Sequence, residues 1–133
     1  MVYAFTIKRK LPSLNDVIAK NRANRYFGAK FKADIEEAIG WDIKQALTKG
    51  TLKPVTEPCD ILIDFYESTK RRDVDNIQSA QKFILDSMVK NGILKNDNRK
   101  WVKQIYHTIK DSSTDYVKVT ILSAGNAKIE TRY

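Results

Sequence analysis

The chain is poor in residues that form cross-links or zinc sites, with one cysteine, Cys59, and one histidine, His107. A single cysteine excludes a disulfide within the chain, as is usual in a reducing cytoplasm, and these two residues are too few for a structural zinc site. No apolar run is long enough for a transmembrane helix, and the first residues lack the layout of a secretion signal. We therefore expect a cytoplasmic protein that does not associate with membranes.

Glycine is also scarce, with five residues in 133, and none forms a phosphate-cradling loop or a dinucleotide-binding fingerprint. Residues 73–78 begin like a calcium-binding loop, but Ile77 replaces the next ligand and Gln78 the required glycine. Nothing indicates a thiol protease, because the one cysteine and the one histidine lie far apart.

Positive charge is present in excess. The formal net charge is +8, and residues 8–32 contribute +7, with eight lysines and arginines against Asp16 alone. Such a segment can be a solvated loop, but its interleaved asparagines and Tyr26 favour an arm that contacts phosphates. The candidate contacts in this arm are Lys8, Arg9, Lys10, Lys20, Arg22, Arg25 and Lys30.

Alternation of apolar and polar residues predicts strands. They cover residues 2–7, 59–66, 101–109 and 116–122. The last two are separated by a polar turn at residues 111–114, so we expect them to pair as a hairpin.

Apolar residues at four-residue steps predict a helix over residues 30–48, which ends at Gly50, and a second helix over residues 75–90. Gly40 inside the first helix suggests close approach of another element. Trp41 lies off the apolar stripe. It could belong to a dimer surface or pack against a second layer, and we favour packing.

Ser13, followed three residues later by Asp16, predicts a short helix before a basic loop that runs to Gly28. The order of elements predicts an α+β fold in one domain over residues 1–123. This is a mixed, mostly antiparallel sheet of about four strands with two main helices packed on it. Residues 124–133 are expected to form a flexible tail.

The densest group of charges follows the second predicted strand, where three consecutive cations precede Asp73 and Asp75. Like charges this close repel unless something neutralises them, and carboxylate oxygens suit Mg²⁺ or Mn²⁺. Arg71 and Arg72 would bind neighbouring phosphates. Alternatively, both aspartates are helix N-terminal acids that satisfy free amides.

Asp97 lies one helix and one loop further on, and we expect the returning chain to bring it to the same end of the sheet as Asp73 and Asp75. Simple turn chemistry is the alternative for Asp97. Lys82 follows Asp75 by about two helical turns and is placed to stabilise transition-state charge or to orient water. Asp86 is expected to pair with Lys82 or Lys90.

The ordered set of these residues resembles the RusA family of Holliday-junction resolvases, endodeoxyribonucleases found in phages and prophages. The resemblance rests on Arg72-Asp73-Val74-Asp75-Asn76, Lys82, Asp86, Gly92 and Asp97, with Pro12-Ser13-Leu14-Asn15 near the start. It extends over most of residues 1–122. Two features depart from the family pattern: the spacing from Asp75 to Lys82 is longer by about one turn, and Asn96 stands where many members have an aspartate.

The resemblance implies a homodimer that uses Mg²⁺ to nick symmetric strands of a four-way DNA junction during recombination and repair. It assigns Asp73, Asp75 and Asp97 as catalytic metal ligands and Lys82 as the catalytic lysine. Two other hypotheses remain open: a catalytically inactive DNA-binding accessory protein, and a metal-dependent nuclease that acts on flap or RNA substrates.

Overall fold

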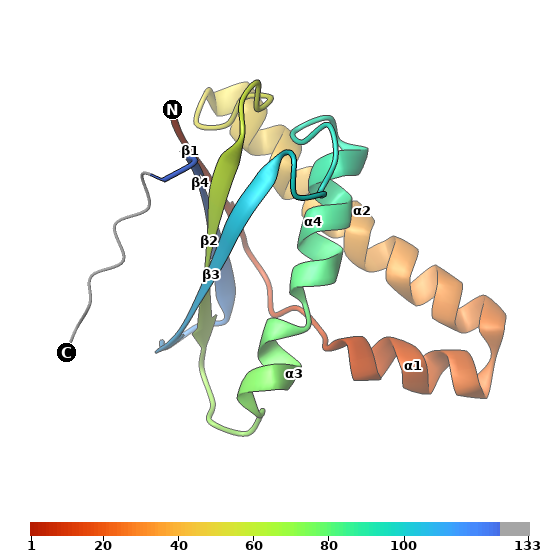
Figure 1. Ribbon diagram of the computed structural model, residues 1–133. Helices are drawn as coiled ribbons and strands as arrows, with labels where there is room; N and C mark the ends of the chain where they lie inside the picture. The colour runs from red at the N-terminus through yellow and green to blue at the C-terminus, as the bar shows by residue number, and fades with distance from the viewer. Residues whose placement is uncertain (126–133) are drawn as a thin grey trace.

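A mixed four-stranded sheet forms one layer of the molecule, and the helices cover one of its faces (Figure 1). The computed structural model describes residues 1–125. The strands are β1 (Val2–Ile7), β2 (Cys59–Glu67), β3 (Val102–Asp111) and β4 (Tyr116–Ser123), in the spatial order β1-β4-β2-β3. The predicted single α+β domain is confirmed. Of the tail expected at residues 124–133, residues 126–133 lie outside the described part of the chain.

The hairpin expected between β3 and β4 is wrong, because β2 lies between them. β2 pairs with β3 in parallel and with β4 antiparallel. The register of the parallel pair runs from Cys59 opposite Val102 to Glu67 opposite Asp111. Both strands therefore start at one end of the sheet and finish at the other. Alternation in a sequence reports the faces of a strand and not its neighbours, so it could not reveal this arrangement.

Two helices, α1 (Leu14–Ala23) and α2 (Arg25–Lys49), form a helical hairpin (Figure 1). Its closed end projects away from the sheet, and the last turns of α2 pack against the sheet. The short helix predicted after Ser13 is confirmed, and its start has the expected capping box. The basic loop predicted up to Gly28 is wrong. Asn24 alone separates the helices, and its side chain accepts a hydrogen bond from the Tyr26 amide at 2.8 Å.

The predicted apolar stripe of α2 is confirmed, with Ile35, Ile39 and Ile43 buried. The helix ends where it was expected to, because Gly50 adopts the left-handed conformation, at φ 79°. The packing predicted for Trp41 is wrong, since 60% of this residue is exposed. The close approach predicted at Gly40 is confirmed: a Cβ there would lie 3.3 Å from the side-chain nitrogen of Asn91.

The helix predicted over residues 75–90 is divided into α3 (Val74–Gln78) and α4 (Gln81–Lys90). Ser79 stands at the break, where its hydroxyl donates a 2.7 Å hydrogen bond to the carbonyl of Asn76. Serine side chains that bond to nearby backbone groups compete with regular helix. The extra turn between Asp75 and Lys82 therefore forms a separate short helix.

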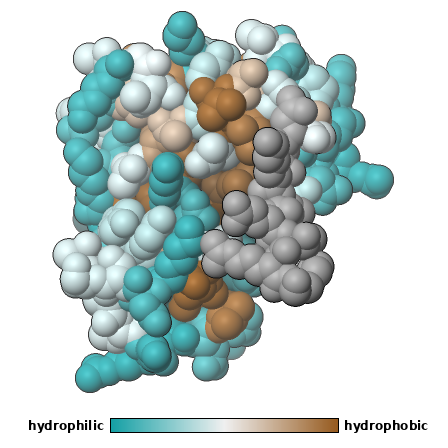
Figure 2. All heavy atoms as spheres, turned by 90° about the vertical axis from the view of Figure 1, so that its left-hand side faces the viewer, coloured by the Kyte–Doolittle hydropathy of each residue, from teal (hydrophilic) through white to brown (hydrophobic). Residues whose placement is uncertain are grey.

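The core lies between the helices and one face of the sheet, where Ile61, Ile63 and Phe65 of β2 are buried. The other face carries the alternate residues and no helix of the described chain covers it (Figure 1). On that face the rings of Tyr66 and Tyr116 stack at 4.2 Å. Figure 2 shows it as a mixture of apolar and hydrophilic side chains. None of the helices within residues 1–125 has the length and apolarity needed to cross a membrane.

α1 and α2 pack closely at Gly28, where an added Cβ would lie 1.6 Å from the side-chain oxygen of Asn21 and 2.9 Å from its Cα. We expect Gly28→Ala to lower the free energy of unfolding by about 1–3 kcal/mol, because backbone must move to admit the methyl group. The matched control is Gly40→Ala, which gains the same helix propensity and meets only a side-chain amide. Urea denaturation and hydrogen exchange of residues 14–30 measure both. Equal stability of the two variants would contradict the prediction.

Candidate functional site

Asp73 and Asp75 stand at the start of α3, beyond the end of β2, and both side chains are exposed. Asp73 occupies the N-cap position, yet its side chain makes no capping hydrogen bond. Asp75 lies in the first turn, where an acid is favourable to the helix dipole. The alternative role as helix-capping acid therefore does not apply to Asp73, whose carboxylate is left without that partner.

A helix from the basic segment begins beside this acidic pair. The side-chain amide of Asn15 donates a 2.8 Å hydrogen bond to the side-chain oxygen of Asn76, and the Leu14 amide donates one of 2.9 Å to the Ser79 hydroxyl. Residues from two parts of the motif, 61 positions apart in the chain, are thus in direct contact. Sequence reasoning noted Asn15 and Asn76 separately and missed that they pair.

Arg72 performs a structural task. Its guanidinium donates to both carboxylate oxygens of Glu67, at 3.0 and 3.1 Å, and to the carbonyl of Leu11 at 2.8 Å. Glu67 is buried, so this bidentate pair joins the end of β2 to the segment before α1. Arg71, its neighbour in sequence, is exposed.

Asp97 does not reach the acidic pair within one protomer. Asp73 follows the end of β2 and Asp97 precedes the start of β3, and these lie at opposite ends of the parallel pair. Within residues 1–125 the three carboxylates form no group that could hold one metal ion. Figure 1 shows α3 beyond one end of the sheet and the α4–β3 loop beside the far part of α4. The expectation that the returning chain brings the three carboxylates together is therefore not met in the single chain.

Lys82 lies with Asp97 and not with the acidic pair in the charge network around α4. Its ammonium donates to Asp86 at 3.1 Å, which confirms the pairing expected for Asp86. The hydrogen bond and charge of Asp86 raise the pKa of Lys82, and the charges of Asp97 and Glu36 add to this effect. Lys82 therefore remains protonated at neutral pH, as a cation that stabilises negative charge must.

Lys32 joins this network from α2. Its ammonium lies 3.5 Å from Asp86 and 3.7 Å from Glu36. One buried carboxylate oxygen of Glu36 has no hydrogen-bond partner in the described chain. Two cations and two acids thus hold α2 and α4 together and orient Lys82.

The three candidate metal ligands do not form one group within the described chain. Within residues 1–125, no three His, Cys, Asp or Glu side chains are grouped so that they could hold one metal ion. No ion pair in this range involves Asp73, Asp75 or Asp97, and Asp97 interacts with Lys82 through its charge alone. The hard oxygens of the three carboxylates suit Mg²⁺ or Mn²⁺, and two of these carboxylates lie on one short helix.

The predicted basic contacts fall into two groups. Arg9 pairs with buried Asp42 at 3.1 Å, Lys30 pairs with Asp34 at 3.2 Å, and the Lys8 ammonium donates to Gln45 at 3.5 Å. Arg72, which was also predicted to bind phosphates, is bonded to Glu67 and Leu11 instead. The rest of the predicted cations are exposed: Lys10, Lys20, Arg22, Arg25 and Arg71. Sequence reasoning overlooked a second group of exposed cations around Asp97: Lys95, Arg99 and Lys100. Their spacing within one short loop was the available signal.

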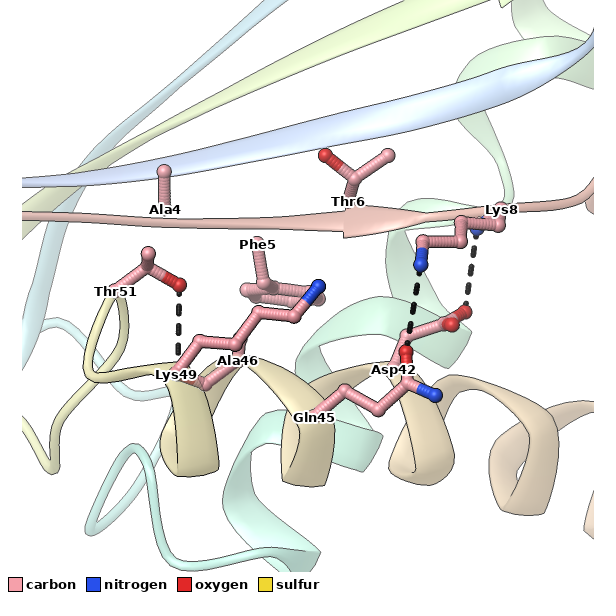
Figure 3. A pocket seen from close by; sticks show the side chains of 9 residues that line it. All are labelled: Ala4, Phe5, Thr6, Lys8, Asp42, Gln45, Ala46, Lys49 and Thr51. Atoms are coloured by element: carbon pink, nitrogen blue, oxygen red, sulfur yellow. Dashed lines mark hydrogen bonds between the residues drawn. The ribbon is translucent and has the colours of Figure 1, made fainter.

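A pocket of about 270 Å³ opens between β1 and the last turns of α2 (Figure 3). Lys8 and Lys49 lie at its rim, and the Lys8 amide donates to Asp42 at 3.3 Å. None of Asp73, Asp75, Asp97 or Lys82 lines it, so we do not assign it to the same site.

The remaining reactive side chains are structural. Burial, together with the charge of Asp60, raises the pKa of Cys59 to about 11, which keeps the thiol protonated. His107 packs edge-on against Phe65 at 5.6 Å, and burial lowers its pKa.

Comparison with known proteins adds no family assignment: no protein-family model matches the chain, and neither does any curated protein.

We expect Arg72→Ala to lower the free energy of unfolding by about 2–4 kcal/mol, because it leaves the buried Glu67 carboxylate unpaired. Arg71→Ala is the matched control and should change stability by less than about 0.5 kcal/mol. Urea denaturation measures both, and filter binding should show weaker DNA affinity for the Arg71 variant. Unchanged stability in the Arg72 variant would show that the Glu67 pair is dispensable.

We also expect Asp86→Asn to lower the pKa of Lys82, since it removes the largest cause of the raised value. Glu36→Gln should lower it less, because Glu36 acts only through its charge at longer range. Titration of the lysine side-chain NMR signals above pH 9 measures both shifts. A larger effect of Glu36→Gln would contradict the assigned order of causes.

Proposed function

We propose that the protein is a Mg²⁺-dependent, structure-selective endodeoxyribonuclease that resolves four-way DNA junctions in the cytoplasm. The observation that carries the proposal is the exposed, uncapped carboxylate of Asp73 beside that of Asp75, next to the start of α1, whose last turn carries Lys20 and Arg22. Acids for a metal ion and cations for a DNA backbone are thus parts of one rigid unit. The ordered RusA-like motif supports the same activity.

The proposed chemistry uses two groups of residues: the acidic pair Asp73 and Asp75, and the cation Lys82. A bound Mg²⁺ would lower the pKa of a water molecule and offset charge on the attacked phosphate. Asp73 and Asp75 would hold the ion, and protonated Lys82 would stabilise the negative charge that develops on the phosphate oxygens. Arg71 and the exposed cations of α1 would hold neighbouring phosphates, so binding should weaken steeply with salt.

We propose further that the site is completed between two protomers. Within one chain Asp97 and Lys82 lie apart from Asp73 and Asp75, so a three-carboxylate site needs Asp97 of the partner subunit. A two-fold dimer would then contain two such sites, which suits paired nicks on a symmetric junction. Exposed Lys95, Arg99 and Lys100 would come to the DNA together with Asp97.

Mixing two inactive variants tests this arrangement. We expect Asp75→Asn and Asp97→Asn each to abolish cutting of a synthetic four-way junction while junction binding is retained. Refolded together, the two variants should recover about a quarter of the wild-type sites, because half of the dimers are mixed and each mixed dimer has one intact site. Nicks are mapped on all four strands with and without Mg²⁺.

The control is a mixture of Asp73→Asn with Asp75→Asn, which lie on the same half and should not complement each other. Absence of recovery from Asp75→Asn with Asp97→Asn would show that the site does not form between protomers. A wild-type protein that binds junctions and cuts none of them with Mg²⁺ or Mn²⁺ would favour the second candidate, an inactive junction-binding protein. The separation of the three carboxylates within one chain is the observation in favour of that candidate.

A further inference from the structure

The tip of the α1–α2 hairpin carries two exposed aromatic residues that no element of the described chain covers. Tyr26 is 69% exposed and Phe27 is 55% exposed, both in the first turn of α2. Their ring centroids lie 6.0 Å apart with the planes inclined at 59°. Exposed apolar side chains that adjoin one another can mark an interaction site.

The tip is held rigidly, so the two rings have a fixed position. Asn24 caps α2 by accepting from the Tyr26 amide, and Asn21 of α1 packs against Gly28 without room for a methyl group. The other end of α1 is fixed to α3 through Asn15 and Asn76. The tip therefore stands one length of α1 away from the acidic pair, about 15 Å for ten residues.

The charges around the rings select the class of partner. Arg22 and Arg25 are exposed at the tip, and Lys20 lies over the Phe31 ring at 5.8 Å. Two copies of this tip would repel each other, which argues against a contact between identical tips. Exposed aromatic rings bordered by cations are suited to nucleic acid, because bases stack on the rings and phosphates pair with the cations.

We propose that Tyr26 and Phe27 stack on bases that open at a DNA branch point and so provide the selectivity for branched over duplex DNA. The inference rests on the proposed function for its substrate but concerns binding alone. Bases inside a duplex are stacked on their neighbours and are not accessible, whereas bases at a branch can be opened at lower cost. The cations at the tip would act on any DNA, and the rings only on a branch.

Binding in EDTA tests the inference without cutting. The variant is Tyr26→Ala with Phe27→Ala, and the matched control is Trp41→Ala, which removes an aromatic residue of similar exposure that also lies beside a lysine on α2. We expect the double variant to weaken binding to a four-way junction by about tenfold or more, and binding to a duplex by less than about twofold. The control should change neither, and circular dichroism should show all variants folded.

A second readout locates the contact directly. With 5-iodouracil at the branch point, ultraviolet light should cross-link the wild-type protein at Tyr26 or Phe27, as mass spectrometry of the peptides would show. Equal junction binding by the double variant and the wild type, or an equal loss in the Trp41 control, would overturn the inference. So would conversion of a dimer to a monomer by the double variant with branch selectivity unchanged, since the tip would then be a contact between protomers.

The outcomes separate this inference from the proposed nuclease activity. Wild-type protein that selects junctions through the tip but does not cut would sustain the inference and refute the activity. A Tyr26→Ala, Phe27→Ala variant that cuts junctions as well as the wild type would sustain the activity and refute the inference. Wild-type protein with no preference for branched DNA would refute both.

Discussion

The parallel, in-register pairing of β2 with β3 determines where every candidate catalytic residue lies. A parallel pair requires the chain to cross over between the ends of the sheet, and here α3 and α4 make that crossover. Residues after β2 are consequently held at one end and residues before β3 at the other. Asp73 and Asp75 belong to the first group and Asp97 to the second, although only 22 positions in the chain separate Asp75 from Asp97. Asp75 and Asp97 are therefore close in the sequence and apart in the folded protomer.

The charge distribution follows the same division. At the end with α3, two free carboxylates stand beside the basic helix α1, and Arg72 is used to fix the loop between β2 and α3 to the rest of the domain. In the α4 network, Lys82 is held protonated by Asp86 among residues that α2 and the α4–β3 loop contribute. The α3 end supplies the two carboxylates of Asp73 and Asp75, and the α4 network supplies the ammonium of Lys82. A two-fold assembly that joins unlike halves is the simplest way to bring carboxylates and ammonium to one phosphate, and the proposed activity depends on it.

Much of the fold was predictable from the sequence, because periodicity and end signals are local. The strand at residues 2–7, the capping box at Ser13, the buried stripe of α2 and its end at Gly50 were all correct for this reason. The strand neighbours were not predictable, since the hairpin expectation used only the proximity of β3 and β4 in the chain. At the break, the Ser79 hydroxyl donates to the Asn76 carbonyl and also accepts from the Leu14 amide, a contact between residues 65 positions apart that the sequence could not reveal. Trp41 is exposed because no second layer packs against its side of α2 in the described chain. The site residues were identified by their chemistry, but their grouping required the topology.

The contact between Asn15 and Asn76 has a consequence for how the surface responds to its surroundings. Both partners are amides, which carry no net charge and do not titrate, so neither salt nor acid weakens their hydrogen bond in the way that it weakens an ion pair. The forces that attract a polyanion to α1 vary strongly with ionic strength, whereas the joint that aligns α1 with α3 does not. If DNA binds as proposed, concentrated electrolyte would therefore release it without disturbing the alignment of α1 with α3.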